Sequence, residues 1–278
     1  MTAPMLQIAG LEAGRPLIMG VINATPDSFY DGGRHTGADA AIAHGTALLE
    51  QGADILDVGG ESTRPGADPV PEDVELDRVI PVVRALADQG AVVSIDTRNA
   101  GVMTAAADSG AKMINDVAAL TRPGAMKAAA DSGLPVVLMH ADADPQTMQN
   151  APTYDDVVAE VLAYLQTRIA ACEAAGMPRD RVIADPGIGF AKTPDHNAQL
   201  LAGLETFEAL GVPILLGVSR KSFIGHFSKG EAADDRLPGS LAAALWGVTQ
   251  GASILRVHDV AETAQALAIW RAVSGSPV

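Results

Sequence analysis

The sequence predicts an α/β protein built as a single (β/α)8 TIM barrel, and three observations lead to this prediction. First, eight short apolar runs alternate along the 278 residues with segments rich in alanine and leucine. Second, each of the seven passages from a helical segment to the next run carries a glycine, which suits the left-handed residue that ends a helix. Third, polar residues gather after the apolar runs, as they do on the active face of a barrel.

The expected strands, in chain order, are Leu17–Asn23, Ile55–Gly60, Val92–Thr97, Met113–Val117, Val136–His140, Val182–Gly187, Ile214–Arg220 and Ser253–His258. Helical spacing between them is clearest in Asp39–Gln51, Leu76–Asp88 and Val157–Ala175, and consecutive parallel strands need such crossovers. The glycines before the strands are Gly52, Gly90, Gly110, Gly133, Gly176, Gly211 and Gly251. An open doubly wound sheet is the alternative, because the same alternation of strands and helices builds it.

Composition limits the classes that need considering. With 48% hydrophobic residues the chain can bury one full core, so we expect residues 1–278 to form one domain. Residues 1–14 lack a cationic start followed by an apolar core, and no later stretch approaches the roughly 20 apolar residues of a membrane span. We therefore expect a cytoplasmic protein with no membrane partner. The lone Cys172 is expected to be a buried thiol, and the net charge of −15 argues against nucleic acid as a partner.

An anionic ligand would need local cations, and these follow the apolar runs. The segment Ile214–Gly225, ILLGVSRKSFIG, ends a predicted buried strand in a loop with two cations and two hydroxyls. A helix can start at Ser222, and its free N–H groups and positive dipole end would suit an anion beside Arg220 and Lys221. The other cations at such ends are Arg64, Lys192, Arg256 and His258.

Three further polar residues, Asp96, Asn115 and Asp185, end the third, fourth and sixth predicted strands, and Lys221 follows the seventh. Each has an ordinary explanation as a helix cap or a turn former. In a closed barrel, however, all four can face one pocket. Carboxylates in a largely apolar pocket are unfavourable unless a ligand or neighbours satisfy them, so the set indicates a polar heterocyclic ligand.

The motifs on these loops resemble one family. In chain order they read NATPDSFYDGG, GGESTRPGA, SIDTR, INDV, LMH, DPGIGF, GVSRKSFIG and RVHDV. This series is similar to that of the dihydropteroate synthases, over about Pro16 to Leu267. The resemblance implies a transferase of folate biosynthesis that condenses a dihydropterin methyl diphosphate with para-aminobenzoate and releases pyrophosphate. It also implies Mg²⁺ on the diphosphate, a homodimer and inhibition by sulfonamides.

The resemblance assigns roles to particular residues. The pterin-binding positions are Asp96, Asn115, Met139, Asp185, Gly217, Lys221 and Arg256. The para-aminobenzoate positions are Thr63, Arg64, Pro65, Phe190 and Ser222, and the diphosphate positions are Asn23, Thr63, Arg256 and His258. Asn23 would also supply an oxygen to Mg²⁺. The residues expected to act in catalysis are Asp27, Arg64, Lys221, Arg256 and His258. We hypothesise that Asp27 supports the cationic centre that forms as diphosphate leaves.

The chain departs from the family pattern at two places. Ala191 stands where the family usually has a second glycine, and Ala141-Asp142 replaces a usual Met-Gln pair. Ala191 would narrow its loop if the backbone there needs a positive φ. Three alternatives remain: a pterin-binding paralogue without turnover, a pterin-dependent methyltransferase, which should lack STRPG and SRKSF, and an aldolase that uses Lys221 as its amine.

Overall fold

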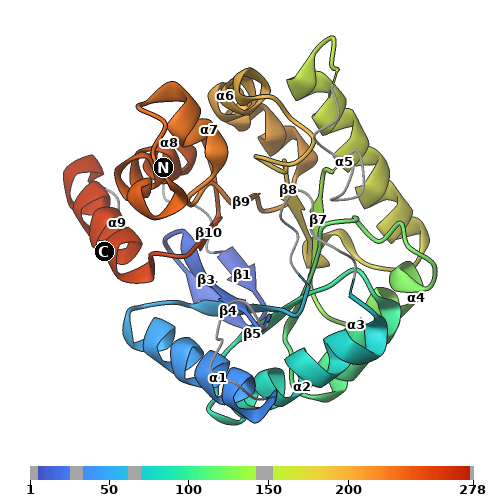
Figure 1. Ribbon diagram of the computed structural model, residues 1–278. Helices are drawn as coiled ribbons and strands as arrows, with labels where there is room; N and C mark the ends of the chain where they lie inside the picture. Colours follow the sequence, from blue (N-terminus) through green and yellow to red (C-terminus); the bar gives the residue numbers. More distant parts are fainter. Residues whose placement is uncertain (1–5, 26–33, 62–69, 142–152, 276–278) are drawn as a thin grey trace.

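The computed structural model describes residues 6–25, 34–61, 70–141 and 153–275, and within these ranges eight parallel strands form a closed barrel inside a ring of helices (Figure 1). The strand order is β8-β7-β6-β5-β4-β3-β10-β9. The two ends of this order meet, because Ala184 of β8 bridges Ile214 and its N–H donates to the carbonyl oxygen of Pro213 at 2.9 Å. The predicted (β/α)8 barrel is confirmed, and this closure excludes the open doubly wound sheet.

Each barrel strand lies within one of the eight predicted runs. The strands are β3 (Leu17–Asn23), β4 (Ile55–Gly59), β5 (Val93–Asp96), β6 (Met113–Asp116), β7 (Val136–Met139), β8 (Val182–Asp185), β9 (Leu215–Leu216) and β10 (Ile254–Val257). Most are shorter than predicted at the carboxyl end, and β9 is the shortest. There the backbone leaves the sheet, and Arg220 adopts a left-handed conformation with φ of 59°.

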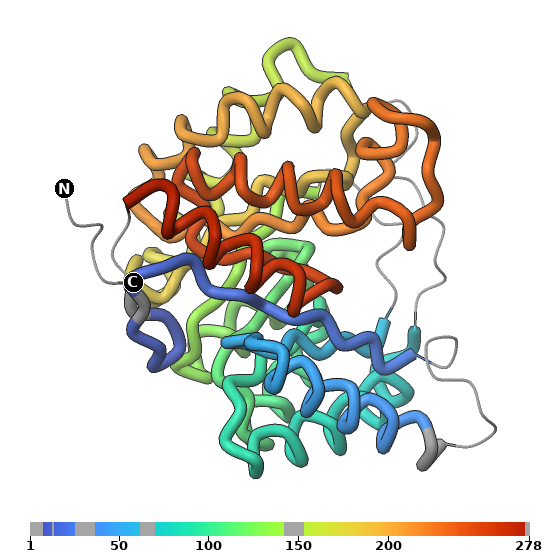
Figure 2. Tube along the Cα trace, turned by 90° about the vertical axis from the view of Figure 1, so that its left-hand side faces the viewer, coloured from blue at the N-terminus to red at the C-terminus, as the bar shows by residue number. Residues whose placement is uncertain are grey.

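The helices are α1 (Arg34–Glu50), α2 (Glu72–Asp88), α3 (Ala100–Asp108), α4 (Ala125–Ser132), α5 (Val157–Ala174), α6 (Pro194–Ala202), α7 (Ser222–Phe227), α8 (Leu237–Thr249) and α9 (Val260–Ser274). Short 3-10 turns cover Arg179–Arg181, Leu204–Leu210 and Ala233–Asp235. All seven predicted helix-ending glycines have positive φ, from 63° to 103°. The last helix, α9, packs beside the first barrel strand, β3, as the red and blue tubes of Figure 2 show.

Alternation along the strands divides the core into two layers. Outward-facing residues such as Leu56, Ile114 and Leu255 pack against the helices, whereas inward-facing residues such as Met113 and Ile183 fill the barrel. Cys172 is buried, as expected. Within the described ranges, no helix has the length and apolar composition needed to cross a membrane.

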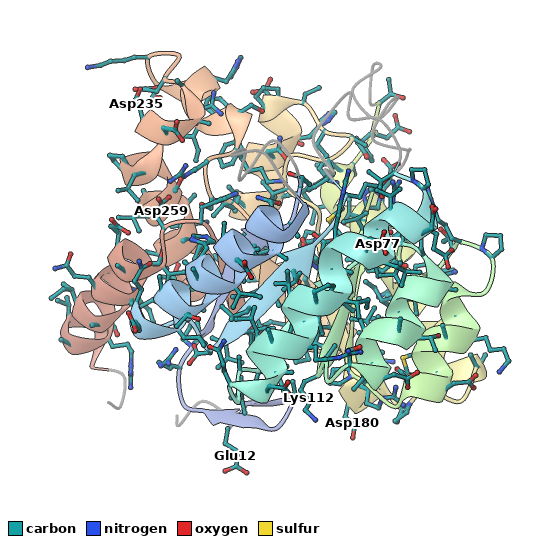
Figure 3. All side chains as sticks on the ribbon, turned by 60° about the horizontal axis from the view of Figure 1, so that its bottom comes forward. Glu12, Asp77, Lys112, Asp180, Asp235 and Asp259 are labelled. Atoms are coloured by element: carbon teal, nitrogen blue, oxygen red, sulfur yellow. The ribbon has the colours of Figure 1, made fainter. Side chains whose placement is uncertain are left out.

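The sequence did not predict the antiparallel hairpin formed by β1 (Leu6–Ile8) and β2 (Leu11–Ala13). Its Ile8 is buried against the inner apolar cluster, so the hairpin covers the amino-terminal end of the barrel. Glu12 marks this end in Figure 3, together with Lys112 and Asp180, which precede barrel strands. The opposite end of the barrel is therefore the one available for a ligand.

Candidate active site

At the carboxyl end of the strands, the inward-facing positions change from apolar to polar. Asp57 on β4 lies one layer above Ile55, and Asn115 on β6 lies above Met113. The strand register places Asp96 opposite Asn115, and Met139 opposite Asp185. The barrel therefore brings together residues that are far apart in the sequence, because all parallel strands end at the same rim.

Arg256 of β10 is the centre of this polar layer. Its Nε donates to Asp57 Oδ2 at 2.7 Å, and its Nη2 donates to Asp96 Oδ2 at 2.8 Å. Asn115 Nδ2 donates to the same Asp57 oxygen at 3.0 Å. Burial acts to lower the pKa of Arg256, but the carboxylates of Asp57 and Asp96 outweigh it and leave this pKa raised. The guanidinium thus stays charged at any physiological pH.

Asp96 is almost fully buried, and burial raises its pKa to about 7, against the opposing charge of Arg256. The neighbouring carboxylates of Asp57, Glu75 and Asp116 raise this pKa further. Near pH 7, Asp96 can therefore exist with or without its proton. The ionised carboxylate accepts hydrogen bonds from a heterocycle, and the protonated carboxyl can also donate one.

Asp57 is a site residue that the sequence analysis missed. It lies inside an apolar run, ILDVG, and is completely buried. Its Oδ2 accepts two hydrogen bonds, whereas its Oδ1 has no hydrogen-bond partner among the described residues. The sequence carried no distinctive signal for this residue, because the full burial that makes a lone carboxylate unfavourable without a cationic partner is visible only in the structure.

Asp185 and Lys221 approach the same layer from β8 and from the start of α7. Asp185 Oδ1 accepts from the backbone N–H of Gly187 at 2.7 Å, and burial raises its pKa in spite of this bond and of Lys221. Lys221 Nζ lies 4.0 Å from the centroid of the Phe190 ring. Burial, then the charge of Arg256, lowers the pKa of Lys221 to about 8, and Asp185 and Asp96 act in the opposite direction. Lys221 is therefore mostly protonated at pH 7.

The DPGIGF loop closes tightly over this lysine. Gly189 has φ of +83°, and a Cβ atom there would lie 2.9 Å from Lys221 Cδ. Ala191 also has positive φ, 47°, and accepts a hydrogen bond from Tyr154 Oη at 2.9 Å. The backbone at Ala191 therefore does adopt the left-handed conformation considered from the sequence, at a cost of about 1–2 kcal/mol for a residue with a Cβ atom.

Lys192 contacts the same loop through its ammonium group. It is buried, and its Nζ lies 3.0 Å from His140 Nδ1 and 2.9 Å from the carbonyl oxygen of Phe190. Burial, then the charge of Lys192, lowers the pKa of His140 to about 3, so this histidine is neutral at pH 7. We interpret Lys192 as a support for the Phe190 loop.

Arg220 is oriented differently from Lys221. It donates to both carboxylate oxygens of Asp259, at 3.0 and 2.6 Å, and to Asp234 at 2.7 Å. The Asp259 hydrogen bond is the main cause of its raised pKa. Figure 3 shows Asp259 on the side of the barrel away from Glu12. Of the two adjacent cations predicted for an anion site, only Lys221 reaches the polar layer, while Arg220 joins two loops.

His258 follows β10, and its Nδ1 lies 3.0 Å from Ser219 Oγ. Burial, then the charges of Arg256 and Arg220, lowers the pKa of His258 to about 4. Asn23 ends β3 and is half-buried. Within the described ranges no group of three or more His, Cys, Asp or Glu could hold a metal. A single amide oxygen from Asn23 fits Mg²⁺, which commonly takes its other ligands from substrate phosphates and water.

Of the remaining predicted site residues, some lie in the described ranges and some outside them. Met139 is buried at the end of β7, and a Cβ atom added to Gly217 would lie 3.9 Å from Arg256 Cβ. Phe190 is half-buried, and Ser222 is exposed at the first position of α7. Four of the predicted residues lie outside the described ranges, namely Asp27, Thr63, Arg64 and Pro65.

Comparison with known proteins gives consistent matches over the whole barrel. The family model described as "Pterin binding enzyme" matches residues 19–258. The dihydropteroate synthase of Escherichia coli strain K12 is 48% identical over 267 residues, which cover 96% of this chain and 94% of that protein. The Xanthomonas albilineans dihydropteroate synthase solved with 4-aminobenzoic acid is 52% identical with a TM-score of 0.93, covering 99% of this chain and 100% of that one. Its complex with 7,8-dihydropteroate aligns with a TM-score of 0.88 at 49% identity and the same coverage.

Proposed function

Because this chain belongs to the pterin-binding enzymes and, among them, to the dihydropteroate synthase family, we propose that its polar rim condenses 6-hydroxymethyl-7,8-dihydropterin diphosphate with para-aminobenzoate. The products are 7,8-dihydropteroate and pyrophosphate. One observation supports this most directly: Asp57, Asp96, Asn115 and Arg256 form one connected set of hydrogen bonds at the mouth of the barrel.

The pterin ring is proposed to bind in this layer. Its N–H groups would donate to the carboxylates of Asp96 and Asp185, and its ring carbonyl would accept from the ammonium group of Lys221. Asn115 can both donate and accept, and the planar guanidinium of Arg256 can lie against the ring face. A heterocycle that lacks these groups would leave buried polar atoms unpaired, which is a strong basis for selectivity.

The diphosphate is proposed to lie between Arg256, His258 and Asn23. As the bond between the pterin methylene carbon and the diphosphate oxygen breaks, its electron pair moves to the diphosphate. Arg256 and a donor N–H of His258 would stabilise the growing negative charge. Mg²⁺ held on the diphosphate with Asn23 would supply further neutralisation of the leaving group. The electron-rich ring delocalises the positive charge left on the methylene.

Para-aminobenzoate is proposed to bind near Phe190 and Ser222, with its carboxylate close to the start of α7. Its amine nitrogen attacks the methylene carbon, a carbon–nitrogen bond forms, and the amine loses a proton. Thr63, Arg64 and Pro65 are proposed to complete this site, and Asp27 to support the cationic centre. A homodimer and a cytoplasmic location also remain proposals that rest on the resemblance.

The test mixes purified protein, the dihydropterin diphosphate, para-aminobenzoate and Mg²⁺, and follows dihydropteroate by chromatography. Formation of dihydropteroate that depends on all three additions, and that a sulfonamide inhibits in competition with para-aminobenzoate, would support the proposal. Pterin binding without pyrophosphate release would instead identify a paralogue without turnover. Borohydride reduction in the presence of a carbonyl substrate should give no adduct on Lys221, which excludes the aldolase alternative.

A further inference from the structure

Ser219 and His258 contact each other across the loops that follow β9 and β10. Ser219 is buried, with 6% of its surface exposed. Its Oγ accepts a hydrogen bond from the backbone N–H of His258 at 3.2 Å and lies 3.0 Å from His258 Nδ1. The Ser219 side chain is thus held between the backbone and the ring of the same histidine.

The neighbouring residues hold this contact in register. One position further along each loop, Arg220 forms its two hydrogen bonds to the carboxylate of Asp259. The backbone N–H of Arg220 donates to Ser240 Oγ at 2.9 Å, and Arg236 donates to the Arg220 carbonyl oxygen at 3.0 Å. The two loops are therefore joined by consecutive pairs, which fixes the position of Ser219 relative to the imidazole.

The hydrogen bonds available to Ser219 favour one tautomer of the His258 imidazole. The hydroxyl of Ser219 has one proton, and His258 Nδ1 is the acceptor within reach in the described part of the chain. If Nδ1 carried the proton instead, the buried hydroxyl proton would have no acceptor among the described residues, which is unfavourable for a polar group removed from water. The favourable arrangement has Ser219 donating to Nδ1, so the single ring proton lies on Nε2.

This tautomer gives His258 a defined function in the proposed reaction. Nε2 lies on the opposite edge of the ring from Ser219. Burial of His258, then the charges of Arg256 and Arg220, disfavour a second ring proton. A neutral imidazole in the other tautomer would present a lone pair to the diphosphate, which is repulsive. The hydroxyl of Ser219 would therefore decide whether the Nε2 edge of His258 donates a hydrogen bond to the diphosphate or repels it.

We propose that Ser219 is a positioning residue that holds neutral His258 as the Nε2–H tautomer, so that Nε2 donates a hydrogen bond to the diphosphate group of the substrate and of pyrophosphate. This inference rests on the proposed function. It adds a residue, Ser219, to which the resemblance gave no role.

The variants are Ser219→Ala, which removes the hydroxyl, and Ser219→Thr, which keeps it. Ser132→Ala is the matched control, because the Ser132 hydroxyl donates to the Ala129 carbonyl oxygen at the end of α4, away from the site. Three properties are measured: the tautomer of His258 by nitrogen-15 NMR of histidine-labelled protein, the affinity for inorganic pyrophosphate by calorimetry, and the affinity for 6-hydroxymethylpterin, which lacks the diphosphate. His258→Gln assigns the NMR signal.

In the wild type at pH 7 we expect the His258 signals of a neutral ring protonated on Nε2. Ser219→Ala should give a mixture of tautomers and weaken pyrophosphate binding by about two- to tenfold, the value of one hydrogen bond. Ser219→Thr should restore both properties. Affinity for 6-hydroxymethylpterin should not change in any of these variants, nor should any property change in Ser132→Ala.

An unchanged tautomer or unchanged pyrophosphate affinity in Ser219→Ala would overturn the proposal. Equal loss of pterin affinity, or failure of Ser219→Thr to restore binding, would also overturn it, because either result indicates a general structural role. Failure of the wild type to form dihydropteroate would reject the proposed function separately, since the tautomer and pyrophosphate binding are measured without turnover.

Discussion

The guanidinium of Arg256 and the carboxylate of Asp57 are joined by a 2.7 Å ion pair between residues 199 positions apart. Asp57 is fully buried, whereas the Arg256 side chain remains 23% exposed toward the mouth of the barrel. The same Asp57 oxygen also accepts from Asn115. Asp57 therefore orients two proposed pterin-binding residues without facing solvent itself.

Replacing Asp57 by asparagine keeps its shape and removes the charge. We expect kcat/KM for the dihydropterin diphosphate to fall about 10- to 100-fold, because a hydrogen bond to a charged group contributes about 1.5–3 kcal/mol. Steady-state kinetics checks this, and circular dichroism confirms the fold.

The matched control is Asp54→Asn. Asp54 pairs with Arg15 at 2.6 Å at the amino-terminal end of the barrel. This change should lower the free energy of unfolding, because the partly buried Asp54 also accepts a hydrogen bond from the backbone N–H of Ile18. The value of kcat/KM should stay within about twofold of the wild type, because Asp54 lies at the other end of the barrel from the polar layer. Equal kinetic losses in both variants would mean that Asp57 acts only through stability.

The raised pKa of Asp96 predicts a pH dependence of stability. The folded protein holds this proton with a pKa of about 7, against an ordinary value of 3.8. The folded state thus binds more protons than the unfolded state between about pH 4 and 7, and the free energy of unfolding falls as pH rises through this window. Asp96→Asn should remove this contribution, which we place at about 1–3 kcal/mol between pH 5 and pH 7.5.

Urea denaturation of the wild type and of Asp96→Asn at pH 5 and pH 7.5 measures this change in the free energy of unfolding. The difference between wild type and Asp96→Asn isolates Asp96 from other carboxyls with raised pKa, such as Asp116. A difference that is independent of pH would show that Asp96 is already fully ionised at pH 5.

Phe190 contacts the Lys221 ammonium at 4.0 Å. Phe190→Leu should raise the KM for para-aminobenzoate about 2- to 10-fold, because it removes a cation–π contact of about 0.5–2 kcal/mol and the aromatic surface beside the proposed substrate ring. Phe227→Leu is the control, since Phe227 is 54% exposed on the same helix as Ser222. Unchanged kinetics in Phe190→Leu would remove Phe190 from the proposed site.

Ala191 has φ of 47°, which disfavours any residue with a Cβ atom. Ala191→Gly should raise the free energy of unfolding by about 0.5–1 kcal/mol, the relief of about 1–2 kcal/mol less the greater entropy of glycine in the unfolded chain. Ala242→Gly, on an exposed position inside α8, should lower it by about 1 kcal/mol. Chemical denaturation compares the two, and a loss of stability in both variants would show that Ala191 is not strained.

The motif residues Asp96, Asn115, Asp185, Lys221 and Arg256 could be assigned to one rim because each follows a recognisable apolar run. Asp57 could not be assigned in this way, because it lies inside an apolar run and not after one. A single charged residue within a five-residue run does not change the apolar pattern that predicts the strand. The difference between Arg220 and Lys221 was also hidden in the sequence. It depends on the left-handed backbone at Arg220 and on Asp234 and Asp259, which are distant in the chain.

The sequence by itself determined the number and chain order of the eight barrel strands, the glycines that end the helices, and the family, because these depend on local periodicity and short motifs. Only the tertiary structure decided which charges meet. Closure of β8 onto β9 brings all strand ends to one rim, and the Asp57–Arg256 and Ser219–His258 contacts form there. Their energies depend on distance and burial, which exist only once the barrel has closed.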